Sequence, residues 1–332
     1  PAGSRLVACD FRSPLIDFVG GRYLYHLIHD LVSAGYTPVY RRNYRFLASM
    51  RSKSYKRMLL DLPLHTYASE GDLAQPELLV TDSPRVAQQT GIERSVLIDY
   101  EHRRAEADEF ALQFGLNPTI VAERFEPIDA DLESPRPNGV YFAGNIDDKG
   151  YDRDVLRDRY GVVTRRELIR LLQTTDQLPT PFVPTEPEAV ERLSDGHPIA
   201  LAIKAGCRVQ PSDWLRQMAE ADFFLGCPGT QMPMCHNLIE ALAVGTIPIL
   251  EYEQYTEPAL KDGVNCLTFR GADDALAVLR RALAMSLAEK NHLRRGAHEF
   301  YRRHHAPGQM VESMLAVEAN PVTLVMNDYR VP

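Results

Sequence analysis

A polar loop, a short helix and a continuous apolar strand follow one another between residues 226 and 250, and this run constrains the fold more than any other part of the chain. Apart from Glu240, residues 238–244 are small or aliphatic, and they predict a helix that Gly245 ends. The sequence TIPIL at 246–250 then predicts a strand. Residues 235–237 enter the helix, so its free backbone N–H groups and positive dipole end follow a loop that contains glycine and proline. Such a helix start is a ready site for a phosphate group.

Two sequence blocks extend this pattern. IEALAVGTIPIL at 239–250 and EPALKDGVNCLTF at 257–269 together resemble the donor-binding half of GT-B glycosyltransferases, in which a helix–strand unit that begins Glu-Ala precedes an Asp-Gly loop. FAGN at 142–145, followed by TRRELI at 164–169, is similar to the opening of exostosin-like donor domains. The resemblance implies the fold class, which is α/β of the GT-B type with two Rossmann-like β/α/β domains facing across a cleft.

The composition is that of a globular protein. Of 332 residues, 45% are hydrophobic and 25% charged, and the formal net charge of -8 argues against nucleic acid as the main partner. No apolar run approaches the roughly 20 residues that span a bilayer, and no signal-peptide pattern opens the chain. The five cysteines are widely spread without a C-x-x-C pair, which is typical of a reducing compartment rather than of a disulfide framework or a zinc site. We therefore expect a cytoplasmic protein.

The first part of the chain has the order of elements found in a doubly wound sheet. Residues 6–10 predict a strand, Gly20-Gly21 open a helix that runs to Gly35, and residues 37–40 predict the next strand. Three further short apolar runs predict strands at residues 78–81, 95–99 and 119–122.

The second part repeats this order. Predicted elements are the strand 139–144, a helix capped by Thr164, the strand 198–203, the helix 212–221, the strand 222–226 and the helices 273–287 and 289–304. Three prolines among acidic residues between 126 and 138 predict a domain boundary. With the resemblance, we expect an acceptor-side domain over 1–136, a donor-binding domain over 137–305 and a tail over 306–332 that packs back on the first domain.

The resemblance implies roles for side chains at the start of the helix after residue 235. Glu240 matches the glutamate that binds ribose hydroxyls, and it lies one turn beyond His236 on the same face. A helix-exposed glutamate without a role is the alternative. His236 and Asn237 stand where the family places phosphate- or sugar-contacting groups, although either can simply cap the helix. Many retaining members carry a second glutamate eight positions earlier, where this chain has Met232, so the stereochemical outcome stays open.

Three cations and a loop complete the expected donor site. Arg165, Arg166 and Lys204 are candidates for gripping the diphosphate, a task suited to a planar guanidinium group, with a solvated surface as the alternative. Gly229 and Thr230 follow a buried strand and should line the cleft floor, unless they form an ordinary turn. Because a helix N-terminus and cations can stabilise the diphosphate, we expect no metal site and no cofactor besides the nucleotide-sugar substrate.

The candidates for the base that deprotonates the acceptor lie near strand ends in the first part of the chain. Glu101 and His102 adjoin each other after one predicted strand, and Asp17 follows the first strand. Asp10 and Asp99 end those two strands and are further candidates. Loop residues that are charged only for solubility are the alternative for each of them.

Other motifs argue against different chemistries. The Asp-x-Asp patterns at 129–131 and 152–154 occur in a linker and in an arginine-rich stretch, so we interpret them as solvated acids rather than metal ligands. The chain has no complete dinucleotide-binding fingerprint and no P-loop, which argues against NAD-dependent redox chemistry and P-loop phosphoryl transfer.

A basic and aromatic stretch covers residues 40–57. It predicts either an ordinary helix–loop surface or a surface that docks on an anionic membrane leaflet or a lipid-linked acceptor. The second interpretation would place the protein peripherally at the inner membrane face.

The leading hypothesis is a metal-independent GT-B glycosyltransferase. It would move a sugar from a nucleotide-sugar donor to a glycan or lipid-linked acceptor, as in bacterial surface-polysaccharide assembly. A nucleotide-sugar hydrolase or epimerase-like enzyme would keep the fold and change the chemistry. A non-catalytic nucleotide- or glycan-binding partner of a synthase is the third hypothesis, and Met232 is the residue that favours it.

Overall fold

The computed structural model describes residues 5–13, 21–51, 54–62, 64–69, 75–89, 91–101, 103–122, 131–147, 151, 154–203, 209–230 and 232–326. The chain divides into two compact units. The first comprises residues 1–114 together with 304–331, and the second comprises residues 115–303. In the described part of the chain, no helix combines the length and the apolar character needed to cross a membrane.

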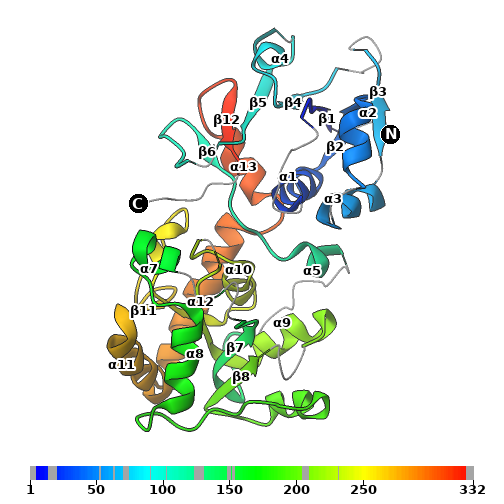
Figure 1. Ribbon diagram of the computed structural model, residues 1–332. Helices are drawn as coiled ribbons and strands as arrows, with labels where there is room; N and C mark the ends of the chain where they lie inside the picture. Colours follow the sequence, from blue (N-terminus) through cyan, green and yellow to red (C-terminus); the bar gives the residue numbers. More distant parts are fainter. Residues whose placement is uncertain are drawn as a thin grey trace. The chain divides into compact units, whose positions relative to one another are not determined.

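The first unit is built on a parallel sheet (Figure 1), whose seven described strands have the order β3-β2-β1-β4-β5-β12-β6. The strands are β1 (Arg5–Asp10), β2 (Tyr36–Arg41), β3 (His65–Tyr67), β4 (Leu78–Thr81), β5 (Arg94–Asp99), β6 (Phe110–Ala111) and β12 (Val322–Val325). The C-terminal strand β12 therefore lies inside this sheet, paired with β5 on one side and β6 on the other.

The helical segments of the first unit are α1 (Arg22–Ser33), α2 (Tyr44–Ser49), α3 (Ser54–Met58), η1 (Leu59–Asp61), α4 (Pro84–Gln89) and α13 (Gln309–Leu315). Gly21 precedes α1 with φ 84°, a backbone conformation that favours glycine. Asp30 of α1 fixes the start of α13, because its two carboxylate oxygens accept from Gly308 N at 2.7 Å and Val311 N at 2.8 Å. The N-terminal and C-terminal parts of the chain are thus joined by a buried cap as well as by the sheet.

The second unit contains a parallel sheet whose five described strands have the order β11-β10-β9-β7-β8. Its strands are β7 (Asn138–Gly144), β8 (Ile199–Ile203), β9 (Ala221–Leu225), β10 (Ile247–Leu250) and β11 (Leu267–Thr268). Its helical segments are α5 (Pro118–Ala122), α7 (Asp154–Tyr160), α8 (Arg165–Thr174), η3 (Pro187–Ser194), α9 (Pro211–Ala219), α10 (His236–Ala243), η4 (Glu253–Tyr255), α11 (Gly271–Ala284) and α12 (Leu287–His304).

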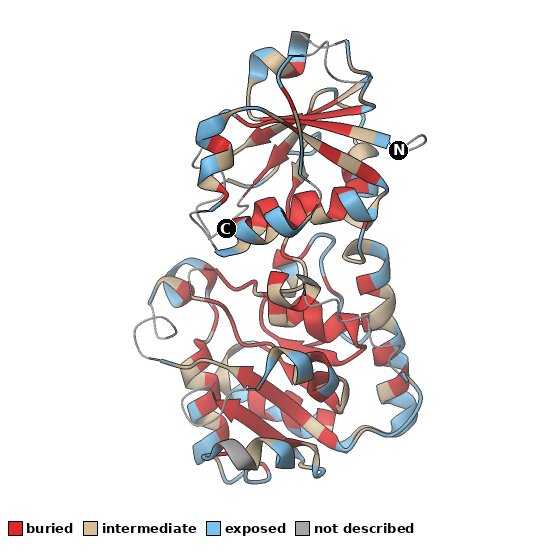
Figure 2. Ribbon diagram, turned by 90° about the vertical axis from the view of Figure 1, so that its right-hand side faces the viewer, coloured by how far each residue is buried: buried red, intermediate tan, exposed pale blue. Residues whose placement is uncertain are grey.

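Two apolar clusters fill the two faces of this second sheet. Alternate strand residues such as Val140 and Phe142 pack with α8 and α11 on one face. Tyr141 and Ala143 pack with α9 and α10 on the other face. Side chains that alternate along a strand point to opposite faces, so the strands are buried on both sides (Figure 2). This is the three-layer α/β/α arrangement that the order of elements predicts.

One strand prediction was wrong. Residues 119–122, interpreted as a strand because of their β-branched apolar run, form the helix α5. Pro118 begins this helix, where its missing N–H costs nothing, and the Asn117 side chain accepts from Thr119 N at 3.0 Å. A proline at the first helical position and a capping asparagine outweigh the strand propensity of three residues.

Candidate functional site

The loop after β9 has a conformation that requires glycine. Gly229 N donates to Pro233 O at 3.0 Å and closes a tight turn. A Cβ atom at residue 229 would lie 2.6 Å from Met232 O and 3.1 Å from Met234 O, so a larger residue would force the backbone to shift. The loop from Cys227 to Gly229 is buried, and Thr230 is half-buried. The predicted loop residues thus lie in a packed, sharply turned segment.

Arg165 links this loop to the loop after β7. It opens α8, behind the Thr164 cap predicted from the sequence, which Glu167 completes as a capping box. Its Nε donates to Pro228 O and its Nη1 donates to Asn145 O, both at 3.1 Å. The guanidinium also lies 4.1 Å from the centre of the Tyr151 ring.

Arg165 is a buried cation without a carboxylate partner in the described residues. It is 4% exposed and makes no ion pair to any described residue. Its Nη2 makes no hydrogen bond there either. Burying a charge without a counter-ion is costly, so residues in this state are often held for an anionic ligand. Arg166, beside it, is half-buried, and Lys204 lies outside the described residues.

Side chains at the start of α10 contact backbone carbonyl groups of other segments. Cys235 occupies the N-cap position and its side chain makes no capping hydrogen bond. Asn237 Nδ2 donates to Ala143 O at 3.1 Å, which ties α10 to the end of β7. His236 Nδ1 lies 3.0 Å from Gly115 O. The alternative interpretation, in which His236 or Asn237 caps the helix, is therefore wrong, because Cys235 is the N-cap residue.

Glu240 is buried and already hydrogen-bonded. It is 1% exposed, its Oε2 accepts from Trp214 Nε1 at 2.6 Å, and its Oε1 accepts from Asn117 N at 3.1 Å. The interpretation of a helix-exposed glutamate is therefore wrong. A ribose hydroxyl that binds Glu240 would therefore have to share the carboxylate with these partners or displace one of them. Sequence reasoning missed Trp214 as a partner, because α9 and α10 meet only in the folded unit.

A second glutamate near this edge of the sheet was also missed. Glu251 directly follows β10 and accepts from Val163 N and from Gly271 N, both at 2.6 Å. Burial raises the pKa of Glu251, while these two backbone hydrogen bonds work in the opposite direction. Its position at the end of the apolar strand TIPIL is the sequence signal that would have found it.

Several of the predicted donor residues of the second unit fall into two sets. Arg165, Gly229 and Asn237 meet at the carboxyl ends of β7 and β9, where ligands bind in open parallel sheets. Glu240 and His236 also belong to α10, but their side chains contact other parts of the unit. Glu240 accepts from Asn117 N and Trp214 Nε1, and His236 Nδ1 contacts Gly115 O.

The predicted bases belong to the first unit. Glu101 is exposed after β5, and its backbone N–H donates to Asp99 Oδ1 at 2.9 Å. Asp99 and Glu109 both pair with Arg103, and Arg103 lowers the pKa of Glu109 by hydrogen bonding. His102 and Asp17 lie outside the described residues.

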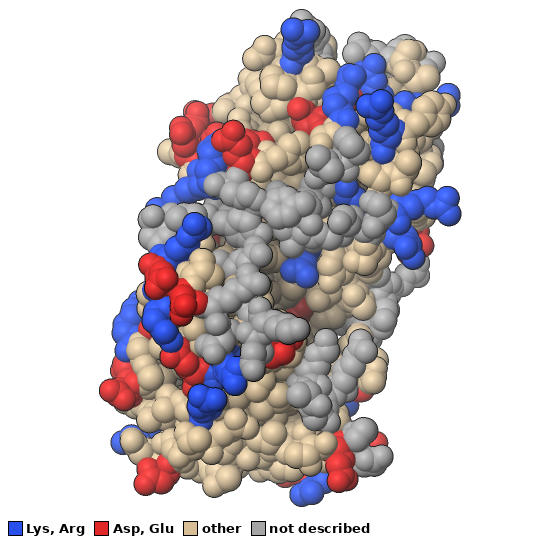
Figure 3. Space-filling model, viewed as in Figure 1, with Lys and Arg blue, Asp and Glu red and all other residues tan. Residues whose placement is uncertain are grey.

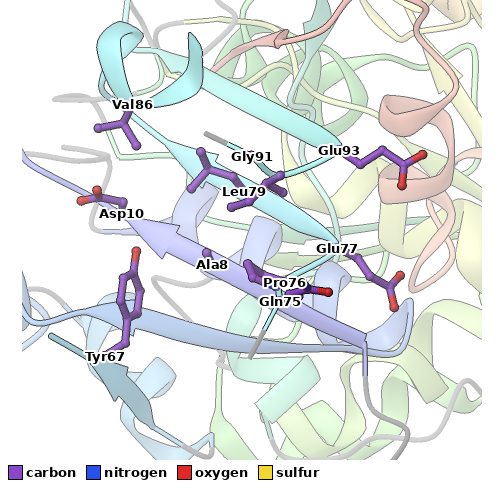
Figure 4. Close-up of a pocket in the computed structure, with 11 residues that line it drawn as sticks. Ala8, Asp10, Tyr67, Gln75, Pro76, Glu77, Leu79, Val86, Gly91 and Glu93 are labelled. Atoms are coloured by element: carbon purple, nitrogen blue, oxygen red, sulfur yellow. The ribbon is translucent and has the colours of Figure 1, made fainter. Parts of the chain in front are cut away.

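Asp10 lies at one end of a pocket of about 480 Å³ on the first sheet. Figure 4 shows Asp10 and Tyr67 at this end, Leu79 in the middle, and Glu77 at the other end. The carboxylate of Asp10 is 1% exposed and pairs with two guanidinium groups at 2.8 Å. These contacts favour a role in holding cations over a role as a base.

Comparison with known proteins shows the fold. No protein-family model matches the chain, and no curated protein matches it. The chain is similar to a glycosyltransferase from Rickettsia africae ESF-5, with a TM-score of 0.52 and 9% identity over 94% of this chain and 97% of that chain. This likeness confirms the predicted fold class, α/β of the GT-B type.

Two further structures have lower scores. Anabaena Alr3699/HepE in complex with UDP and glucose has a TM-score of 0.45 and 12% identity over 94% of this chain and 99% of that chain. The lipopolysaccharide outer core galactosyltransferase WaaB in its apo form has a TM-score of 0.45 and 12% identity over 93% of this chain and 98% of that chain.

Proposed function

We propose that the chain is a glycosyltransferase that moves a sugar from a nucleotide-sugar donor to a glycan or lipid-linked acceptor. The second unit would bind the donor, and the acceptor and the base would belong to the first unit. The observation that carries the proposal is Arg165, a buried guanidinium group with no described carboxylate partner at the carboxyl ends of two parallel strands. The shared fold with a protein named as a glycosyltransferase supports it.

The donor's diphosphate is the group that this site suits. The Nη2 of Arg165 offers two N–H donors, and the nearby start of α10 offers backbone N–H groups and a positive dipole end. Because charge builds up on the leaving diphosphate, a fixed cation and fixed dipoles stabilise the transition state more than the ground state. We propose that these groups stabilise the leaving diphosphate without a metal ion. Treatment with EDTA should then leave the transfer rate unchanged.

Arg165→Gln tests the role of this guanidinium. Removing one charge-assisted contact to the diphosphate should lower kcat/KM for donor by about 10- to 100-fold, because such a contact contributes about 1.5–3 kcal/mol. Arg170→Gln is the matched control, since Arg170 is exposed on the same helix and removes the same charge. Equal effects of the two substitutions would contradict the proposal. Arg165→Lys keeps the charge, and recovery of part of the rate would separate lost catalysis from misfolding.

A second candidate function rests on Met232. This residue is apolar and 8% exposed, and it stands where many retaining members of the family that the chain resembles have glutamate. A non-catalytic nucleotide-binding partner of a synthase would keep the binding groups and lack turnover. Donor binding without sugar transfer or sugar release, across a panel of acceptors, would favour this function over the first.

A further inference from the structure

The first unit contains a pocket lined mainly by arginines. This arginine pocket consists of Arg12, Arg41, Arg42, Asn43, Tyr44 and Arg45 and has a volume of about 430 Å³. Arg12 lies just after β1, Arg41 ends β2, and the other four residues lead into α2. Because β1 and β2 are parallel neighbours, their carboxyl ends meet and bring these segments together.

Asn43 fixes the shape of the arginine pocket. Its Nδ2 donates to Phe11 O at 3.0 Å, which ties the start of α2 to the loop after β1. Its Oδ1 accepts from Arg45 N at 3.1 Å and Phe46 N at 3.4 Å, as an N-cap residue does. The backbone N–H of Arg12 donates to Asp82 Oδ1 at 2.7 Å. The walls are therefore held by hydrogen bonds before any ligand arrives.

The charge in the pocket is not balanced. Arg12 and Arg41 pair with the buried Asp10. Arg42 and Arg45 are exposed and make no ion pair to a described residue, and Arg42 Nε donates only to Thr66 Oγ1 at 3.3 Å. Figure 3 shows basic side chains gathered near the top right, where Figure 1 places α2 and β3.

Four guanidinium groups thus lie beside two carboxylates, Asp10 and Asp82. Asp82 is itself occupied by the backbone of Arg12 and Ser13 and by the Tyr100 hydroxyl. Planar guanidinium groups match the oxygens of a phosphate in a bidentate way, and several of them together suit a dianion better than a single carboxylate.

Tyr44 adds an aromatic surface to the arginine pocket. It is 79% exposed, more than any other large hydrophobic residue in the described part of the chain. An exposed ring beside cations is the combination that contacts the apolar face of a sugar ring while the cations hold its anionic substituent. The pocket volume suits a ligand the size of a sugar phosphate.

We propose that the arginine pocket binds the phosphate group of a phosphorylated saccharide, with Tyr44 against the sugar ring. The phosphorylated saccharide would be the acceptor of the transfer, and this part of the proposal rests on the proposed function. A sugar phosphate is favoured over a bilayer because Tyr44 is the one large apolar side chain among the residues that line the pocket. It is favoured over nucleic acid because the net charge of the chain is -8.

Binding is measured by ³¹P NMR line broadening with three probes, which are inorganic phosphate, a hexose 6-phosphate and vesicles that contain phosphatidic acid. Calorimetry with the neutral hexose completes the series. We expect the hexose phosphate to bind more tightly than inorganic phosphate, and the neutral hexose not to bind at the same concentrations. Binding to the vesicles alone would overturn the proposal in favour of a membrane surface.

The double substitution Arg42→Gln/Arg45→Gln should raise the Kd for hexose phosphate by about tenfold or more, because two charge-assisted contacts are lost. Both side chains are exposed and leave the Asp10 ion pairs intact, so the fold should survive. Arg85→Gln removes an exposed arginine of the same unit outside the pocket and should change nothing. Equal affinities in wild type and the double variant would overturn the proposal.

Two further variants separate the parts of the proposal. Tyr44→Ala should weaken hexose phosphate binding and leave inorganic phosphate binding unchanged, whereas an unchanged Kd for both would remove the saccharide from the proposal. Arg165→Gln should leave hexose phosphate binding unchanged. If donor binding fails while the arginine pocket still binds the sugar phosphate, the proposed function fails and the phosphate site stands.

Discussion

At the scale of single residues, the hydrogen bond between Trp214 and Glu240 bears most on the role of that glutamate. The family resemblance assigns Glu240 to ribose, yet its carboxylate is 1% exposed and accepts from Trp214 Nε1 at 2.6 Å. A role in binding ribose is compatible with these contacts only if the ribose hydroxyls share the carboxylate with its present partners or displace one of them. The pair is therefore both a structural contact and a reporter of the site.

Trp214→Phe should lower the free energy of unfolding by about 1–3 kcal/mol, because it leaves a buried carboxylate oxygen without its donor. In a Glu240→Gln background the same change should cost less, since the neutral amide is cheaper to leave unsatisfied. A double-mutant cycle by urea unfolding measures this coupling. Additive effects of the two substitutions would show that the hydrogen bond contributes nothing to stability.

At the scale of elements, β12 decides whether the first unit is complete. This strand comes from the last part of the chain and lies between β5 and β6, with Leu324 fully buried. Its pairing partner β5 lies more than 200 residues earlier, at Arg94–Asp99. The sequence predicted that the C-terminal tail returns to the first domain, but no local pattern indicates a strand in the middle of the sheet.

Leu324→Ala should destabilise the first unit by about 2–5 kcal/mol, the usual cost of a cavity in a core. Thr323→Ala is the matched control, because Thr323 belongs to the same strand and is only half-buried. Hydrogen–deuterium exchange of peptides from β1 and β5 measures the opening of the sheet. Equal exchange in the two variants would contradict the central place of β12.

Local elements were predicted well where one short sequence specifies both the element and its ends. The helix α8 has its cap at Thr164 and completes the capping box with Glu167, three residues later in the sequence. The strand β10 is bounded by Gly245 with φ 66° and ends in Leu250. The helix α5 shows the opposite case, where Pro118 and the Asn117 cap outweigh the strand propensity of Thr119 to Ala122.

The candidate site was predicted less completely than the fold. Arg165 and Gly229 were proposed because they lie in motifs, and Arg165 Nε donates to the carbonyl of Pro228, the residue before Gly229. Trp214, Glu251 and the arginine pocket were missed or only partly recognised. Each depends on segments that are distant in sequence and meet only when parallel strands bring their carboxyl ends to one edge.

At the scale of the whole molecule, acid should weaken the first unit. Burial lowers the pKa of His26 to about 3 and the pKa of His305 to about 3, well below the value near 6.5 in an unfolded chain. Between about pH 3 and pH 6.5 these histidines bind more protons in the unfolded state than in the folded state. The free energy of unfolding therefore falls as the pH is lowered from about 6.5. Each histidine contributes a slope of about 1.4 kcal/mol per pH unit.

We therefore expect exchange of β1 and α1 amides to accelerate between pH 6.5 and 5, after correction for the intrinsic rate, while β7 and β9 change less. His26→Gln should reduce this acceleration, because it removes one of the histidines whose pKa burial lowers in this unit. The burial-raised pKa of Asp30 acts with the opposite sign, since it favours proton uptake in the folded state. An acceleration that is the same in both units would contradict the assignment to these histidines.

Trp214, the single tryptophan of the chain, reports directly on a nucleotide-sugar site in the second unit. Its emission should change when a nucleoside diphosphate occupies the site at Arg165 and α10, because its indole N–H contacts Glu240 of that helix. A titration with UDP, GDP, ADP, CDP and dTDP should give a saturable change with at least one nucleotide, lost in Arg165→Gln and retained in Arg170→Gln. No change with any of the five, or the same change in both variants, would contradict a nucleotide-sugar site in the second unit.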